Sequence, residues 1–257
     1  MMKKSILCLT LGLLGFTLPV QAQKSEGESL LRAALKGWHV KLRAGFLLGG
    51  TTPLPLPQEI RAIDSYNPTM NIGIEGNAQK MFEQTDWGIA LGVRLETKGM
   101  KTDATVKNYH MEMTADDGGY MVGAWTGHVK TNVRSTYLTF PLLAIYKVAP
   151  RWELRGGPYL SWMYDGNFTG EAYDGYIRHG DPTGEKAEVS RASYDFSDDL
   201  RRFQWGVQVG AEWQAYKHLS VYADLTWGIN SIFPKDFDSV TFAMYPVYLN
   251  AGFSYLF

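Results

Sequence analysis

The sequence predicts an all-β protein, an eight-stranded antiparallel up-and-down transmembrane β-barrel. Three observations carry the prediction: eight segments alternate apolar and polar residues with a period of two, aromatic residues gather at the ends of their apolar faces, and the connections alternate short and long. The 257 residues are 45% hydrophobic and include 8 Trp, 15 Tyr and 12 Phe, with a formal net charge of -1. Because Lys and Arg do not outnumber Asp and Glu, the chain lacks the excess of positive charge that nucleic-acid-binding proteins carry, and no nucleic-acid partner is expected.

The first residues have the pattern of a secretory signal peptide at 1–22. Lys3 and Lys4 precede an apolar stretch, and Val20-Gln21-Ala22 has the small residues of a cleavage site. We expect 23–37 to be a short periplasmic N-terminal segment and 38–257 to be the barrel. The single cysteine, Cys8, would leave with the signal, so disulfides, Cys-type metal sites and thiol catalysis are excluded from the mature chain.

Each predicted strand is long enough to cross a bilayer at a tilt, which takes about 9–11 residues. The first four and their leading apolar residues are 38–48 (Trp38, Val40, Leu42), 70–79 (Met70, Ile72, Ile74), 87–98 (Trp87, Ile89, Leu91) and 136–148 (Leu138, Phe140, Leu142). The last four are 152–164 (Trp152, Leu154, Leu160), 203–213 (Phe203, Trp205, Val207), 219–229 (Leu219, Val221, Ala223) and 245–257 (Tyr245, Val247, Leu249).

Periodicity alone does not say which face points outward, and a soluble lipocalin-type barrel would bury the apolar one. Two features favour a polar lumen. The polar face is rich in glycine and short residues, which suits a narrow eight-strand interior. Its charges also nearly balance, as buried charges must. The predicted lumen ion-pair network is Lys41, Arg43, Glu75, Arg94, Glu96, Glu153, Arg155, Glu212 and Asp224, with Lys98 on the same face.

Aromatic residues on the apolar faces are expected at the two membrane interfaces, where amphipathic rings concentrate. One ring would contain Trp38, Trp87, Trp152, Trp213 and Phe257, and the other Trp162, Tyr164, Phe203, Trp227 and Tyr245.

The connections predict the orientation in the cell outer membrane. The short ones are 80–86, 149–151 and 216–218, and the long ones are 49–68, 99–135, 165–201 and 230–242. Outer-membrane barrels have short periplasmic turns and longer external loops, so both termini would be periplasmic and the long loops extracellular. The terminal Phe257 resembles the C-terminal signal of barrel proteins, which implies the barrel-assembly machinery as a partner, beside outer-membrane lipid and lipopolysaccharide.

A family resemblance covers nearly the whole mature chain. The segment Tyr137-Leu-Thr-Phe-Pro141-Leu-Leu-Ala-Ile-Tyr-Lys147 resembles the strand motif of PorT-like outer-membrane β-barrel proteins of Bacteroidetes, as does Gly157-Pro158-Tyr159-Leu160. Gly49-Gly-Thr-Thr-Pro53-Leu-Pro-Leu-Pro57 resembles the first external loop of Bacteroides members. The resemblance implies an outer-membrane barrel and, for PorT itself, an association with type IX secretion; that activity is not carried over.

Candidate site residues concentrate in the long loops. Asp195, Asp198 and Asp199 are candidate ligands for a calcium ion, although a solvated loop beside lipopolysaccharide explains them as well. His110, His128 and His179 show no close ligand spacing, although the loops could bring Asp116, Asp117 and His128 together. No catalytic set converges by spacing and no cofactor is expected.

Two prolines, Pro141 and Pro158, fall on strands joined by the turn at 149–151. Matching the outward faces pairs residue 142 with 158, which makes the prolines near neighbours. Each removes a ladder donor, so we expect either a weakened seam or a local bulge, and favour the bulge.

Together these observations predict a non-enzymatic barrel with a side-chain-filled lumen and a structural or surface-binding role, with an unidentified protein or glycan ligand at its external loops. The role could also be support of secretion or envelope assembly. The alternatives are an outer-membrane lipid- or peptide-modifying enzyme and a small-solute pore.

Overall fold

The computed structural model describes residues 36–115, 118–180, 182–237, 239–240 and 242–257. The predicted signal at 1–22, and residues 23–35 of the segment that follows it, lie outside the described residues. Residues Trp38–Phe257 form a compact unit of their own, which is described below. In the part of the chain that the structure describes, no helix is long and apolar enough to cross a membrane.

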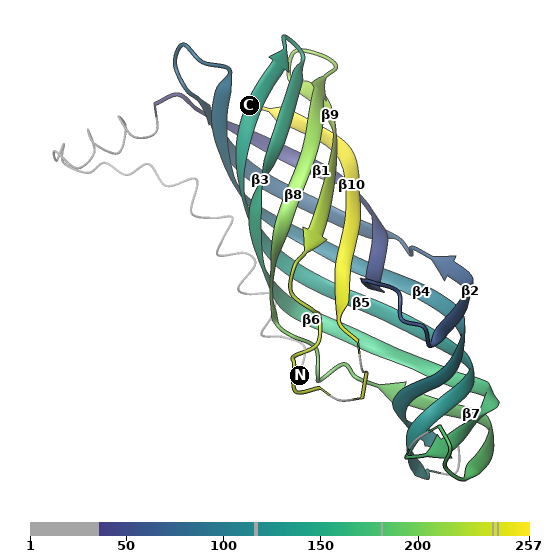
Figure 1. Ribbon diagram of the computed structural model, residues 1–257. Helices are drawn as coiled ribbons and strands as arrows, with labels where there is room; N and C mark the ends of the chain where they lie inside the picture. Colours follow the sequence, from purple (N-terminus) through teal and green to yellow (C-terminus); the bar gives the residue numbers. More distant parts are fainter. Residues whose placement is uncertain (1–35, 116–117, 181, 238, 241) are drawn as a thin grey trace, which may run out of the picture. The chain divides into compact units, whose positions relative to one another are not determined.

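This unit is built from antiparallel strands (Figure 1). In chain order they are β1 (Trp38–Pro53), β2 (Ile60–Asn67), β3 (Asn71–Met81), β4 (Trp87–Ala115), β5 (Tyr120–Ala149), β6 (Trp152–His179), β7 (Lys186–Asp195), β8 (Phe203–Gln214), β9 (Leu219–Gly228) and β10 (Met244–Leu256). Eight of them close a ring in the order β1-β3-β4-β5-β6-β8-β9-β10, with β10 paired back to β1. The predicted fold class and all eight predicted strands are confirmed.

The outer wall of the ring is apolar and its inner wall is polar. Along β1, Val40, Leu42 and Phe46 are exposed, whereas Lys41 and Arg43 between them are buried. The strand β9 repeats the pattern, with Leu219, Val221, Ala223 and Leu225 outward. The membrane-barrel orientation of the faces is therefore correct, because a soluble barrel would bury the apolar side.

The prediction of long loops at 99–135 and 165–201 is wrong. β4, β5 and β6 continue far beyond the ring, and β7 pairs with β6, so these stretches are mostly sheet (Figure 1). The connection at 49–68 likewise contains the end of β1 and all of β2, which pairs with β4. We call the part of the sheet beyond the ring, together with β2 and β7, the extension.

The extension has an apolar core of its own, which explains why it is ordered as sheet. The face of β4 that carries Arg94 and Glu96 inside the ring carries Met100 and Val106 further along. At the tip, Ala115 of β4 pairs with Ala192 of β7, so β4, β5, β6 and β7 close a second, smaller ring. The core contains Met100, Val106, Met111, Met113, Trp125, Val129, Val133, Phe168, Ile177, Tyr194, Phe196, Ile232 and Phe233, among others.

The prediction of a bulge at the two prolines is also wrong, whereas the predicted register is right. Pro141 pairs with Tyr159 and Ala144 pairs with Gly156, which keeps 142 opposite 158 with no register shift between them. Apolar hollows of about 620 and 480 Å³ line the outer wall beside Pro158. The two strands therefore keep one register although Pro141 and Pro158 lack the backbone N–H groups that would donate hydrogen bonds.

A line of irregularities crosses the extension and bends it. The registers of β4–β5 and β5–β6 shift next to Asn108 and Gly127, and both Asn108 and Asp174 adopt left-handed backbone conformations with φ of 55° and 48°. Gly127 and Gly175 meet there beneath Trp125: a Cβ on Gly175 would lie 2.8 Å from the Cα of Gly127 and 2.7 Å from Cζ2 of Trp125. Bulges of this kind curve a sheet and redirect its side chains.

We expect Gly175→Ala to destabilise the extension by about 1–3 kcal/mol, because the added methyl overlaps packed backbone and the Trp125 ring. The measurement is the rate of proteolysis in 99–135 and 165–201 for the folded protein in detergent. The control is Gly76→Ala, whose Cβ meets nothing within 4 Å. Equal proteolysis of the two variants would contradict the close packing.

Candidate functional site

The lumen of the ring holds a continuous network of buried ion pairs. Arg43 of β1 lies 3.1 Å from Glu75 of β3 and 2.7 Å from Asp224 of β9. Arg94 of β4 is 3.2 Å from the other oxygen of Glu75, and its Nε is 3.0 Å from Glu96. The remaining pairs join Lys41 to Glu153 and Glu212, Arg155 to Glu212 and Lys98 to Glu96. All nine predicted residues thus face the lumen and take part in ion pairs.

The network spans the lumen from wall to wall. Gln208 of β8 accepts a hydrogen bond from Arg94 and donates one to Asp224, across the ring from β4. Arg94, Gln208 and Asp224 are each 0% exposed. Toward the extension, Nζ of Lys98 lies 5.2–5.8 Å from the ring centroids of Tyr137, Tyr159 and Tyr248. Side chains therefore fill the middle of the lumen. A hollow of about 220 Å³ remains at the end with the short turns, lined by Lys41, Glu153 and Glu212 among others, and a larger polar hollow lies on the extension.

Seven of the predicted interface aromatics lie on the outer wall. Trp87, Trp152, Trp162, Trp213, Trp227 and Phe257 are exposed and Trp38 is half-buried. Trp152 and Trp213 are cross-strand partners with ring centroids 6.4 Å apart, near the short turns. At the other end of the same strand pair, Trp162 faces Phe203. The spacing of these aromatic positions matches two belts, and their role at the membrane interfaces stays a prediction.

The outward face of the extension carries two polar cross-strand rows. One row is Asn67, Lys101, Asn132, Thr169 and Asp195, and the next is Ser65, Asp103, Lys130, Glu171 and Ser193. Each row takes one residue from each of β2, β4, β5, β6 and β7. We call these ten residues the polar face. They line a hollow of about 870 Å³, together with five neighbouring residues.

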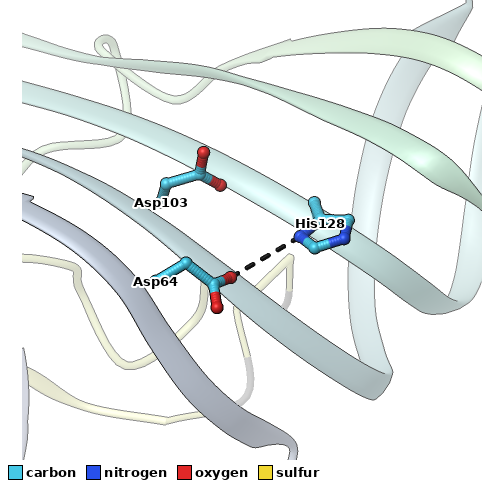
Figure 2. A group of neighbouring side chains, drawn as sticks. All are labelled: Asp64, Asp103 and His128. Carbon is cyan, nitrogen blue, oxygen red and sulfur yellow. Dashed lines mark ion pairs between the residues drawn. The ribbon is translucent and has the colours of Figure 1, made fainter.

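Beside the polar face, Asp64, Asp103 and His128 converge (Figure 2). Their potential ligand atoms all lie within 4.8 Å of one another, and the three residues come from β2, β4 and β5. Asp64 is the extra residue of a bulge, since Ile63 pairs with Ala104 and Ser65 with Asp103. The bulge turns the Asp64 carboxylate toward His128, so that its Oδ2 lies 3.5 Å from Nδ1.

Hydrogen bonds from two neighbours orient the carboxylates of this cluster. The Thr105 hydroxyl donates to Asp64 at 2.7 Å, and the Tyr173 hydroxyl donates to Oδ2 of Asp103 at 2.8 Å. The bond to the Asp103 carboxylate raises the pKa of Tyr173 to about 12, since it stabilises the protonated phenol. The Tyr173 ring also stacks on His128, with centroids 5.1 Å apart.

The other predicted loop residues are not brought together in this way. Among the described residues, Asp64, Asp103 and His128 form the cluster that could hold a metal, whereas Asp195, Asp198 and Asp199 form none. Oδ1 of Asp195 accepts hydrogen bonds from Ser197 instead. Partial burial and the nearby carboxylates of Asp198, Glu112 and Asp195 raise the pKa of Asp199. Asp116 and Asp117 lie outside the described residues.

Sequence reasoning named His128 but missed both of its carboxylate partners. Asp64 and Asp103 lie in stretches that were assigned to loops, where no register relates one residue to another. A signal was nonetheless present, because 99–106 continues the alternation of β4. In that stretch Met100, Ala104 and Val106 share the inward face and Lys101, Asp103 and Thr105 the outward one.

A closed antiparallel ring with an apolar outer wall and an ion-paired lumen defines a membrane-spanning β-barrel protein. The chain belongs to the family described as outer membrane protein beta-barrel domain, whose model matches residues 21–234. It is therefore an outer-membrane β-barrel protein. No curated protein matches the sequence.

Solved structures of three outer-membrane proteins are similar to this chain. Neisserial surface protein A is 10% identical and covered over 98% of its chain and 86% of this one, with a TM-score of 0.30. Ail, the attachment invasion locus protein of Yersinia pestis, in complex with the heparin analogue sucrose octasulfate, is 9% identical over 97% of its chain and 86% of this one, with a TM-score of 0.34. The Escherichia coli outer membrane protease OmpT is 12% identical over 97% of its chain and 86% of this one, with a TM-score of 0.35.

We expect Arg43→Met to reduce the free energy of unfolding by about 3–5 kcal/mol, since it leaves buried carboxylates of Glu75 and Asp224 without this partner. Urea unfolding in lipid vesicles measures the change. The matched control is Arg134→Met on an exposed outward position of β5, which should change stability by less than about 0.5 kcal/mol.

The double variant Arg43→Met/Asp224→Asn tests the pairing itself. Because Arg43 and Asp224 touch, its loss of stability should be smaller than the sum of the two single losses. Strict additivity would show that the two side chains are not coupled.

Proposed function

We propose that this outer-membrane barrel is a non-enzymatic surface-binding protein whose binding surface is the polar face of the extension. Its short turns would face the periplasm with both termini, and the extension would stand outside the cell. The arrangement of short turns at one end and long hairpins at the other supports this orientation. Lipopolysaccharide would then surround the base of the extension. The barrel-assembly machinery would recognise the C-terminal strand, which ends next to Phe257.

The observation that carries the proposal is the hollow lined by the polar face. Lys101 and Lys130 offer ammonium donors, Asn67 and Asn132 offer amides that both donate and accept, and Glu171 offers an acceptor. Such a mixture matches a ligand rich in hydroxyl groups, in which every group is both donor and acceptor. We therefore assign a glycan as the ligand class.

Rigid support beneath the polar face favours binding. Trp125, Val129 and Phe168 are buried under it, so the strands are held before a ligand arrives. Preorganised surfaces lose little conformational entropy on binding. A flexible loop of the same composition would have to be ordered first.

The motif around Pro141 and Gly157-Pro158 supports a narrower proposal, that the chain is a PorT-like member from a Bacteroidetes species. A role in secretion or envelope assembly belongs to the same proposal. Its test is the gene neighbourhood: adjacent secretion genes support it, and polysaccharide-uptake genes would instead favour the glycan-binding role alone.

The filled lumen predicts that the purified protein forms no small-solute pore. In planar bilayers we expect no stable single-channel steps, because Arg94, Gln208 and Asp224 cross the lumen without leaving exposed surface. The Arg43→Ala/Glu75→Ala variant, which removes two of the plugging side chains, is the comparison. Regular conductance steps from the unmodified protein would contradict the proposal and favour the pore alternative.

For glycan binding, we expect the Lys130→Ala/Asn132→Ala variant to bind a glycan selected on an array at least about tenfold more weakly than the unmodified protein, because charged hydrogen bonds in the hollow are lost. Lys107→Ala is the control, since Lys107 is an exposed lysine of β4 outside the hollow. Absence of any glycan binding, or equal loss in the control, would overturn the proposal. Turnover of the bound glycan would instead favour the enzyme alternative.

A further inference from the structure

The cluster of Asp64, Asp103 and His128 combines one imidazole nitrogen with two carboxylates on three different strands (Figure 2). This mixed donor set suits Zn²⁺, which binds His nitrogen and carboxylate oxygen in a shell of four. Calcium instead takes six to eight oxygen ligands and gains nothing from an imidazole. Three protein ligands also leave a position open, as at zinc sites that bind a further molecule.

The distances are close to those that zinc requires. At metal–ligand distances of about 2.0–2.1 Å, tetrahedral ligands lie roughly 3.3 Å apart. Oδ2 of Asp64 and Nδ1 of His128 are already 3.5 Å apart, and the whole set lies within 4.8 Å. Side-chain displacements of about 1 Å or less would therefore bring the three protein ligands to tetrahedral spacing, with the fourth position left open.

The surrounding hydrogen bonds leave the required lone pairs available. Oγ1 of Thr105 lies 3.4 Å from Nδ1 of His128, but its single proton is donated to Asp64. In the tautomer with the proton on Nε2, the Nδ1 lone pair of His128 is therefore available to a metal. Tyr173 donates to Oδ2 of Asp103, whereas Oδ1 of Asp103 is shielded from solvent and accepts no hydrogen bond among the described residues. An acceptor that is buried and unpartnered is costly, and a cation would satisfy it.

The site is also accessible and supported. The side chains of His128 and Asp64 are 39% and 40% exposed, which gives a cation a path from solvent. Hydroxyl groups that orient carboxylate ligands form the outer shell typical of protein metal sites. Lys130 is the cross-strand partner of Asp103, but its Nζ lies over the Tyr173 ring, 4.3 Å from the ring centroid.

We propose that Asp64, Asp103 and His128 bind a Zn²⁺ ion that fastens β2 to β4 and β5 and presents an open coordination position beside the polar face. The site does not depend on the glycan proposal, although Asp103 belongs to both surfaces. Metal binding and glycan binding are measured separately, so that either can fail alone.

The test uses the full folded protein in detergent. Titration with Co²⁺ should give d–d absorption bands at a stoichiometry of one, and Zn²⁺ should abolish them; isothermal titration with ZnCl₂ then gives the affinity. His128→Gln and Asp103→Asn should each weaken Zn²⁺ binding more than about tenfold. The matched controls are His110→Gln and His179→Gln, which remove other histidines of the extension and should bind as the unmodified protein does.

Three outcomes would overturn the proposal. These are no Co²⁺ bands and no Zn²⁺ heat from the unmodified protein, unchanged affinity in both ligand variants, and loss of binding in the histidine controls. A heat of binding with CaCl₂ but none with ZnCl₂ would also overturn the proposal, because a site with an imidazole ligand should not prefer calcium. The heat-dependent shift in electrophoretic mobility confirms that each variant is folded.

Discussion

The structure depends on the pairing of charges inside a narrow closed ring. Because the outer wall is apolar and strands alternate, every second residue must face the lumen, where a lone charge would cost several kcal/mol. Arg43 and Arg94 share Glu75, and Arg43 also reaches Asp224. The pair of Arg43 with Asp224, and those of Lys41 with Glu153 and Glu212, link strands that are not neighbours in the ring. The network therefore fixes distant parts of the wall relative to one another as well as filling the space between them.

The inward face then changes its chemistry along the strands. Ion pairs give way to a layer of tyrosines around Lys98, and above that layer the same face of β4 carries Met100 and Val106. Beyond the ring the outward face is polar, so the inward face supplies the hydrophobic core of the extension. Because the inward face becomes apolar, β4, β5 and β6 remain paired as sheet well beyond the ring. The stretches between the ring strands are therefore sheet packed on a core.

The same change along the strands marks the limit of what the sequence could predict. In the ring strands, such as 38–48 and 219–229, apolar residues alternate on the outward face. This pattern was enough to predict the strands of the ring, the register beside Pro141 and the residues whose charges are buried. Beyond residue 99 the outward positions turn polar, as at Lys101 and Asp103, and this looks like the end of a strand when only an apolar outer face is sought. The Asp64–His128 contact is harder still, because it depends on a bulge that moves one residue out of register.

The bulge in β2 and the hydrophobic core of the extension together fix the position of the Asp64 carboxylate on the polar side. A bulge alone would leave Asp64 on a mobile edge strand, and a core alone would leave its carboxylate turned away from His128. With both present, β2 is held against β4 while one of its side chains points at a residue two strands away. Groups positioned in this way by packed strands keep their geometry before anything binds, so the eight-stranded ring carries a rigid polar surface beyond it while its lumen stays filled.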